Sequence, residues 1–428
     1  MRTPSSPAVW AGVEPSYLTV AGRRRDQLAE TGHAVRLSDI DRLAALGVSA
    51  ARYPVLWGRG GPSTDWAWAR ARLERLIALG IEPIVGLLHH GWGPDGIDPL
   101  GDDYPALFAA YALEVATRFP AVRTFLPINE PLTTARFSGL YGWWDPSARD
   151  DGVFARLIVA QCLAIREATR ALRRFDPSIR TIVNEDAGQT YGTGELEPVI
   201  AFYNDRRWLT FDLLSGRVDS GHPMYGSLTS VPGLAEKLRL LADEPELPDV
   251  LGVDHYITSD RYLDHRLDHY PEDIVARSAQ HGFVDVELAR VAGYEVDGFW
   301  RSLRETWDRY HLPLALTEVH LGGEESDEVL WWAEAWDDAN SAIGSGIPVE
   351  AVTSWAAFGS CDWDTLMCSR SGTYRPGCFD ISRDAPVLTP LGKAIQATAA
   401  GRPPTPRASA WWRQPYRVAF PGDPTMAA

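Results

Sequence analysis

LPINEP, at residues 126–131, is an apolar run that ends abruptly on an acidic residue, Glu130. LALTEV, at residues 314–319, repeats the pattern around Glu318. Such a run is typical of a buried parallel strand, which places the acid at the C-terminal end of the strand. In a (β/α)8 barrel the C-terminal strand ends form the floor of the active site. We therefore expect these two glutamates to meet at one end of a barrel.

The rest of the chain alternates between strand-like and helix-like segments. The expected strands are residues 8–14, 48–57, 81–88, 122–128, 179–184, 250–256, 313–317 and 349–355. The expected helices are residues 38–46, 66–79, 102–119, 153–175, 196–214, 299–310 and 328–343. Alternation argues for a parallel sheet, and eight units argue for closure. The sequence thus predicts an α/β fold, a single (β/α)8 TIM barrel over residues 1–400. A Pro-rich C-terminal tail follows over residues 401–428, in which Trp411 and Trp412 are candidates for holding the tail to the surface.

Composition bounds the partners and the compartment. The 428 residues carry a net charge of −16 at pH 7, and such a surface repels nucleic acid and anionic membranes but not neutral sugars. The N-terminus shows no apolar signal core, and no apolar stretch reaches the length of about 18 residues that indicates a membrane span. The four cysteines lack the C-x-x-C spacing of zinc or redox sites. We expect a cytoplasmic protein without nucleic-acid, membrane or metal partners, and the oligomeric state stays open.

Two carboxylates at separate strand ends are what cleavage of a glycosidic bond with retention requires. One acid protonates the leaving oxygen, and the other, about 5 Å away, attacks the anomeric carbon. We expect Glu130 to be the proton donor, with Asn129 beside it binding a sugar hydroxyl. We expect Glu318 to be the nucleophile, kept ionised by the cation of Arg52 and the hydroxyl of Tyr256. The charge of Glu318 should in turn keep Glu130 protonated near neutral pH.

Other interpretations compete with this one. A single glutamate at a strand end is usually a helix cap or an ion-pair partner, but the Asn-Glu-Pro context and the matching second glutamate favour catalysis. His89 and His90 could form a metal site, but no third ligand is identifiable, and a histidine that contacts the sugar is the favoured interpretation. Glu185 also ends a strand, and we expect it to be a structural or accessory carboxylate.

At these residues the sequence resembles the family 1 glycoside hydrolases, the retaining β-glucosidases and β-galactosidases, and the resemblance spans residues 8–400. Asn129-Glu130-Pro131 is similar to the acid/base motif of that family, and Thr317-Glu318 is similar to its nucleophile motif. Further similar segments are residues 51–57, 88–89, 141–146, 252–256 and 355–363. The resemblance implies a barrel without a cofactor. It also implies substrate-binding roles for Arg52, His89, Asn129, Tyr256, Trp355, Asp362 and Trp363.

The sequence is similar in particular to a divergent branch of that family, whose members are often fused to a domain resembling dTDP-4-dehydrorhamnose reductase. No G-x-G-x-x-G motif follows a strand here, so neither a reductase domain nor a nicotinamide cofactor is expected. Gly12 matches the position of a glucose-binding Gln of the family, and Asp362 replaces a Glu with a side chain one methylene shorter. These departures indicate an altered glycone, such as a deoxy sugar or a pentose, or a natural-product glycoside.

The sequence therefore predicts an enzyme, a retaining β-glycosidase similar to β-glucosidases, that hydrolyses a small-molecule glycoside through a covalent glycosyl-enzyme intermediate. A transglycosylase is the nearest alternative, because an acceptor hydroxyl can replace water. A non-catalytic carbohydrate-binding barrel that assists sugar-nucleotide metabolism is the alternative from another class. The intact glutamates argue against it, since binding alone does not require an acid pair.

Overall fold

The computed structural model describes residues 4–59, 65–278, 282–383, 385–404 and 410–422. Eight parallel strands close into a barrel in the order β1-β13-β12-β9-β7-β6-β5-β4. The strands are β1 (Ala8–Gly12), β4 (Ala50–Pro54), β5 (Glu82–His89), β6 (Thr124–Asn129), β7 (Arg180–Asp186), β9 (Val250–His255), β12 (Leu314–Val319) and β13 (Val349–Ser354). The prediction of a single (β/α)8 barrel is confirmed.

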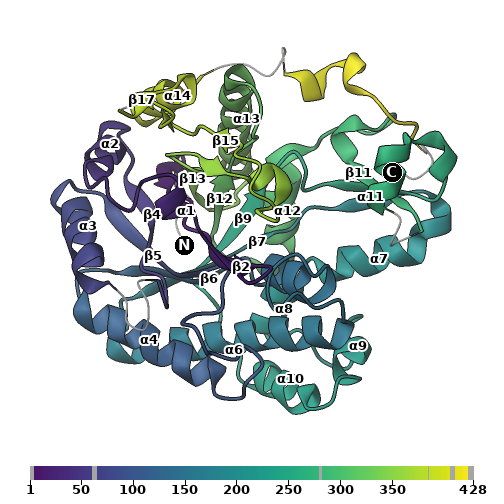
Figure 1. Ribbon diagram of the computed structural model, residues 1–428, viewed down its shortest axis with the longest axis horizontal. Coiled ribbons are helices and arrows are strands. Elements are labelled where there is room, and N and C mark those ends of the chain that lie inside the picture. Colours follow the sequence, from purple (N-terminus) through teal and green to yellow (C-terminus); the bar gives the residue numbers. More distant parts are fainter. Residues whose placement is uncertain (1–3, 60–64, 279–281, 384, 405–409, 423–428) are drawn as a thin grey trace.

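Helices surround this barrel (Figure 1), because each parallel strand must be followed by a crossover to the next. The longer helices are α3 (Trp66–Ala78), α4 (Tyr104–Arg118), α6 (Asp151–Phe175), α7 (Glu197–Arg206), α10 (Leu234–Asp243), α12 (Gly298–Tyr310), α13 (Glu325–Gly344) and α14 (Pro390–Ala399). The shorter ones are α1 (Gln27–Glu30), α2 (Asp39–Ala45), α5 (Pro131–Ala135), α8 (Leu209–Leu214), α9 (Tyr225–Thr229) and α11 (Glu272–Ser278). No helix of the described residues is long and apolar enough to cross a bilayer.

The interior of the barrel is packed by one buried residue from each strand. This layer consists of Trp10, Ala50, Ile84, Leu126, Ile182, Val250, Ala315 and Ala351. Side chains alternate between the two faces of a strand, so that their neighbours, such as Val9 and Ala51, pack in the larger core between strands and helices. Burial on both faces explains the continuous apolar runs in the sequence. This apolar layer fills the middle of the barrel. The polar residues at the strand ends lie beyond it, at the C-terminal end of the barrel.

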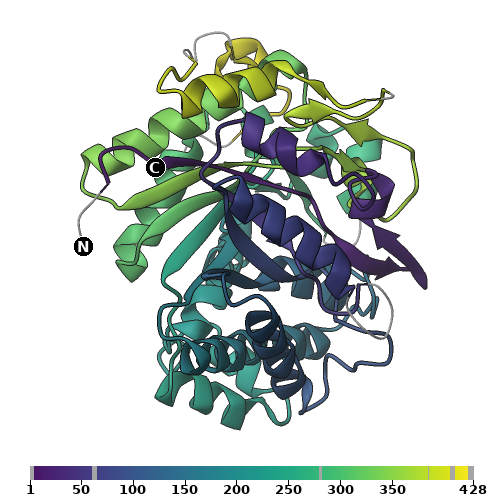
Figure 2. The same cartoon turned by 90° about the vertical axis from the view of Figure 1, so that its left-hand side faces the viewer.

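Several elements outside the barrel differ from the expected pattern. The helix expected over residues 196–214 is interrupted between α7 and α8, and the strand expected over residues 8–14 ends at Gly12. Additional strands form β2 (Tyr17–Val20), β3 (Arg23–Asp26), β8 (Thr190–Gly192), β10 (Arg261–Asp264), β11 (Val284–Glu287), β14 (Ser360–Cys361), β15 (Tyr374–Arg375), β16 (Phe379–Asp380) and β17 (Val387–Leu388). In Figure 2 the β2–β3 hairpin projects from the right-hand side of the molecule. These short strands belong to loops whose polar sequences carry no strong periodic signal.

The described part of the C-terminal tail packs on the barrel through Trp412. Its side chain is 1% exposed, and its ring meets that of Trp331 edge to face with centroids 5.3 Å apart. Its indole Nε1 donates a hydrogen bond of 2.9 Å to Glu334 on α13. Arg413 forms an ion pair with the same carboxylate. Trp412 therefore joins the tail to the helical layer through apolar and polar contacts together.

Trp412→Ala should lower the free energy of unfolding by about 3–5 kcal/mol, because it leaves a cavity and removes a hydrogen bond from the buried Glu334. Urea unfolding followed by tryptophan fluorescence measures the loss. Tyr416→Ala is the control, since Tyr416 lies in the same tail but is 76% exposed. An equal, small effect of both substitutions would show that the tail contributes nothing to stability.

Candidate active site

The two glutamates of the sequence motifs meet at the C-terminal end of the barrel. Glu318 lies on β12, and Glu130 follows β6 directly as the residue before α5. They are 3% and 5% exposed. One carboxyl oxygen of each, together with one of Asp254, lies within 4.8 Å of the others. Residues far apart in the sequence thus form one cluster, because parallel strands bring their C-terminal ends to one side.

A buried guanidinium holds Glu318 in place. Nη1 of Arg52, on β4, donates to Oε1 of Glu318 at 2.8 Å and to the backbone oxygen of Thr317 at 2.7 Å. Its Nη2 donates to Oδ1 of Asn129 at 2.7 Å. The guanidinium also lies over the ring of Trp355, 4.3 Å from the centroid. Arg52 therefore links the ends of three strands around the carboxylate.

The other oxygen of Glu318 is held by Tyr256, whose hydroxyl donates to Oε2. Burial raises the pKa of Glu318 above its usual value, while Arg52 and the hydrogen bond from Tyr256 act in the opposite direction. Both partners stabilise the ionised form. The arrangement is suited to a carboxylate that keeps its charge inside a nearly closed site.

Glu130 has a different environment. Among the described residues its carboxyl has no hydrogen-bond donor or acceptor within bonding distance, and Nε2 of His90 lies 3.7 Å from one oxygen. Burial raises the pKa of Glu130 well above its usual value, and the charges of Glu318 and Asp254 act in the same direction. Glu130 therefore has the environment of a protonated acid, whereas Glu318 has the environment of an ionised carboxylate.

Glu185 on β7 holds the helical turn that directly follows Glu130. The carboxylate of Glu185 accepts hydrogen bonds from the backbone N–H groups of Leu132 at 2.7 Å and of Thr133 at 3.2 Å. It also accepts one from the hydroxyl of Thr210 at 2.7 Å. These are the free N–H groups of the first turn of α5, which a carboxylate satisfies well. Glu185 thus has structural partners, which agrees with the role expected for it.

A chain of hydrogen bonds joins the strand ends behind the pair. Nδ2 of Asn184 donates to Oδ1 of Asn129 at 2.7 Å and to Oδ2 of Asp254 at 2.5 Å. Asp254 accepts a further bond of 2.6 Å from the hydroxyl of Thr317. Burial raises the pKa of Asp254 well above its usual value, and the charge of Glu318 adds to this effect. Asn184 and Asp254 were not among the expected site residues, although Asn184 ends an expected strand and Asp254 lies within the similar segment 252–256.

His89 and Trp355 form one wall of the site, with stacked rings whose centroids are 5.6 Å apart. Asn129 donates from Nδ2 to Nε2 of His89 at 3.3 Å. His90 contacts Trp144, with 4.8 Å between ring centroids, and its Nδ1 lies 2.9 Å from the hydroxyl of Thr134. Burial lowers the pKa of His89 well below its usual value and that of His90 to about 3. Both imidazoles are therefore neutral near pH 7.

The residues that could hold a metal are the carboxylates rather than the two histidines. In the described residues, the cluster of three possible ligands is Glu130, Asp254 and Glu318. Glu318 already faces the guanidinium of Arg52, and Asp254 already accepts two hydrogen bonds. An acidic cluster alone does not make a metal site. The hydrogen bonds and the ion pair that Glu318 and Asp254 already form are equally compatible with a site for an organic ligand.

The segment directly after the first strand contributes a residue that the sequence reasoning missed. Gly12, which matches the position of the family's glucose-binding Gln, leaves no room for a side chain, because a Cβ there would lie 2.2 Å from the ring of Trp355. Glu14 reaches the site instead and accepts a hydrogen bond of 3.2 Å from Nε1 of Trp355. The sequence carried a signal for it, because Glu14 is an acid at the end of the strand expected over residues 8–14.

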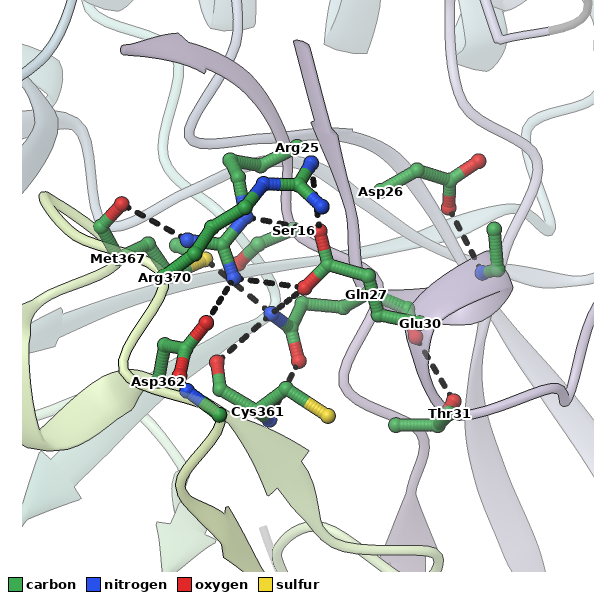
Figure 3. A network of polar contacts seen from close by, with 12 residues as sticks. Ser16, Arg25, Asp26, Gln27, Glu30, Thr31, Cys361, Asp362, Met367 and Arg370 are labelled. Carbon is green, nitrogen blue, oxygen red and sulfur yellow. Dashed lines mark hydrogen bonds and ion pairs between the residues drawn. The ribbon is translucent and has the colours of Figure 1, made fainter. Parts of the chain in front are cut away.

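Asp362 lies at the rim, where its two oxygens already have partners (Figure 3). Oδ2 accepts a bond of 2.9 Å from Arg25, in the β2–β3 hairpin. Oδ1 accepts from the hydroxyl of Ser371 at 2.9 Å and from backbone N–H groups of Gly372 and Thr373 at 2.7 and 3.1 Å. Near it, the carboxamide of Gln27 bonds both backbone groups of Cys361. This cluster fastens the hairpin to the loop after β13.

Trp363, the next residue, lies on the same side of the site as His90. Its ring is 5.7 Å from that of His90 and 6.2 Å from that of Trp144, measured between centroids. The structure therefore gathers the expected residues Arg52, His89, Asn129, Tyr256 and Trp355 around the two glutamates, with Trp363 against His90. The side chain of Asp362 is directed to Arg25 and to residues 371–373 of its own loop.

Comparisons with known proteins show which solved structures share the fold of this chain. No protein-family model and no curated protein matches the sequence. A family 1 β-glucosidase from Thermotoga maritima matches with a TM-score of 0.74 and 17% identity, over 93% of this chain and 98% of that one. The β-glucosidase from the same organism in complex with deoxynojirimycin matches over the same shares, with a TM-score of 0.73 and 17% identity. Its complex with cyclophellitol matches over 94% and 98% of the chains, at 0.73 and 18%. This chain therefore has the fold of the family 1 β-glucosidases.

Proposed function

We propose that the protein is a retaining β-glycosidase. The observation that carries the proposal is the carboxyl pair, in which oxygens of Glu130 and Glu318 lie within 4.8 Å of each other. Retaining enzymes hold their two carboxyl groups about 5–5.5 Å apart, whereas inverting enzymes need about 6.5–9.5 Å to admit a water. The short separation supports direct attack by one carboxylate.

The roles follow from the two environments. Glu318, ionised between Arg52 and Tyr256, attacks the anomeric carbon while the bond to the leaving oxygen breaks. Glu130, held protonated by burial, gives its proton to that oxygen. Water then attacks the anomeric carbon of the glycosyl ester, Glu130 takes its proton, and the carboxylate of Glu318 is released.

The stereochemistry of the first product tests this assignment. Hydrolysis of an aryl β-glycoside followed by proton NMR should show the β-anomer of the free sugar first, with the α-anomer growing only by mutarotation. Two displacements at one carbon restore its configuration. If the α-anomer forms first, the reaction inverts and Glu318 is not a nucleophile.

Removal of each glutamate should give a different result. Glu318→Ala should abolish turnover of all substrates, because no ester can form. Glu130→Gln should slow alkyl glycosides by about 10²–10⁴-fold but aryl glycosides with good leaving groups far less, since only the former require protonation. Glu236→Gln, at a side chain that is 86% exposed, is the matched control and should change neither rate. Equal losses on both substrate classes would remove Glu130 from the role of acid.

Tyr256→Phe should move the acidic limb of the kcat/KM profile to higher pH. The hydroxyl of Tyr256 stabilises the ionised form of Glu318, so its loss raises the pKa of that carboxyl. The enzyme then needs a higher pH before Glu318 is ionised. The basic limb, which belongs to Glu130, serves as the internal reference. A shift of the acidic limb to lower pH would contradict the proposed charge of Glu318.

A further inference from the structure

Glu14 is a buried carboxyl in the candidate site that the mechanism above does not use. It is 4% exposed. Its Oε1 accepts hydrogen bonds from the backbone N–H and the hydroxyl of Ser16, at 2.9 and 2.5 Å. Its Oε2 accepts one bond, of 3.2 Å, from the indole of Trp355. Through Trp355 it borders Arg52, which holds Glu318, so Glu14 belongs to the same site.

Among the residues that the structure describes, Glu14 has no ion pair with a lysine or an arginine. Within the described part of the chain, the basic side chain nearest to it is His89, whose Nε2 lies 3.8 Å from Oε1. His89 is neutral near pH 7, because burial lowers its pKa well below the usual value. The donors of the neighbouring Arg52 are directed to Glu318, Thr317 and Asn129. Burial raises the pKa of Glu14 to about 7, and the charge of Glu318 adds to this effect.

The charge state of Glu14 depends on its partner. A buried carboxylate is costly unless a cation pairs with it, and without one the group favours its protonated form. Oε2 of Glu14 has one donor and can accept another. A cationic donor that arrives with the ligand would therefore stabilise the ionised form of this carboxyl.

We propose that the glycone is an amino sugar, whose ring-borne ammonium group donates to Oε2 of Glu14. This inference rests on the proposed glycosidase function and names its substrate class. An ammonium supplies both the proton donor and the positive charge that the protein lacks at this point. Glu14 is then the specificity-determining residue of the site, and Trp355 positions its carboxyl through the indole hydrogen bond.

The experiment compares aryl β-glycosides in sets that differ at one ring carbon, with a hydroxyl, an amino or an N-acetylamino group at C2, C3 or C4. For wild type we expect one amino glycoside to exceed its hydroxyl parent in kcat/KM by tenfold or more. The N-acetylated form, which has the nitrogen without the charge, should lose this preference. The ratio is the readout, so that differences in overall rate do not enter.

Glu14→Gln should reduce the amino-to-hydroxyl ratio at least fivefold, while the surface variant Glu236→Gln should leave it at the wild-type value. Circular dichroism and thermal unfolding show whether each variant is folded. The proposal is overturned if wild type prefers the hydroxyl parent at all three positions, or if folded Glu14→Gln keeps the wild-type ratio.

Binding separates this proposal from the glycosidase proposal. If no glycoside is turned over, the proposed function fails, and isothermal titration of wild type with free amino sugars and their hydroxyl parents still tests Glu14. Tighter binding of one amino sugar by tenfold or more, lost in Glu14→Gln, would sustain the role of Glu14. Equal or weaker binding of every amino sugar would overturn it.

Discussion

The guanidinium of Arg52 is the interaction on which the candidate site depends. It donates to the side chain of Glu318, the backbone of Thr317 and the side chain of Asn129, and it is 5% exposed. Planar guanidinium groups suit such multiple, directed bonds, and a lysine ammonium could not reproduce them. Without this cation, Glu318 would face Asp254 and Glu130 across a buried space with nothing to balance its charge.

Around that cation the carboxyls divide by their donors. Glu318 has a cation and a phenol hydroxyl, which favour the charged form, whereas Glu130 has neither. Asp254 lies within 4.8 Å of both, and burial together with the charge of Glu318 raises its pKa well above the usual value. Hydrogen bonds from Asn184 and Thr317 then fix its orientation. Environment, not residue type, separates the chemistry of three neighbouring acids.

The fold and the centre of the site could be predicted from the sequence. Barrel strands are buried on both faces, and they can therefore be recognised as apolar runs that end on polar residues. LPINEP and LALTEV located Glu130 and Glu318 for this reason. The rim was less accessible. The sequence directed attention to Gly12, but a side chain at that position would clash with the ring of Trp355. The clash could not be foreseen, because the two residues lie at opposite ends of the chain. The bonds of Asp362 to Arg25 and to its own loop likewise depend on tertiary contacts.

The hydrogen bond between Arg25 and Asp362 joins residues 337 positions apart, so it can form only late in the synthesis of the chain. A ribosome releases the N-terminal hairpin long before the loop that carries Asp362, and a guanidinium is not buried without its carboxylate. Until β13 emerges, β1 and β12 each offer an unpaired strand edge, a template for wrong pairing. The nascent chain, rather than the finished barrel, is therefore the stage at which unpaired strand edges are open to wrong pairing.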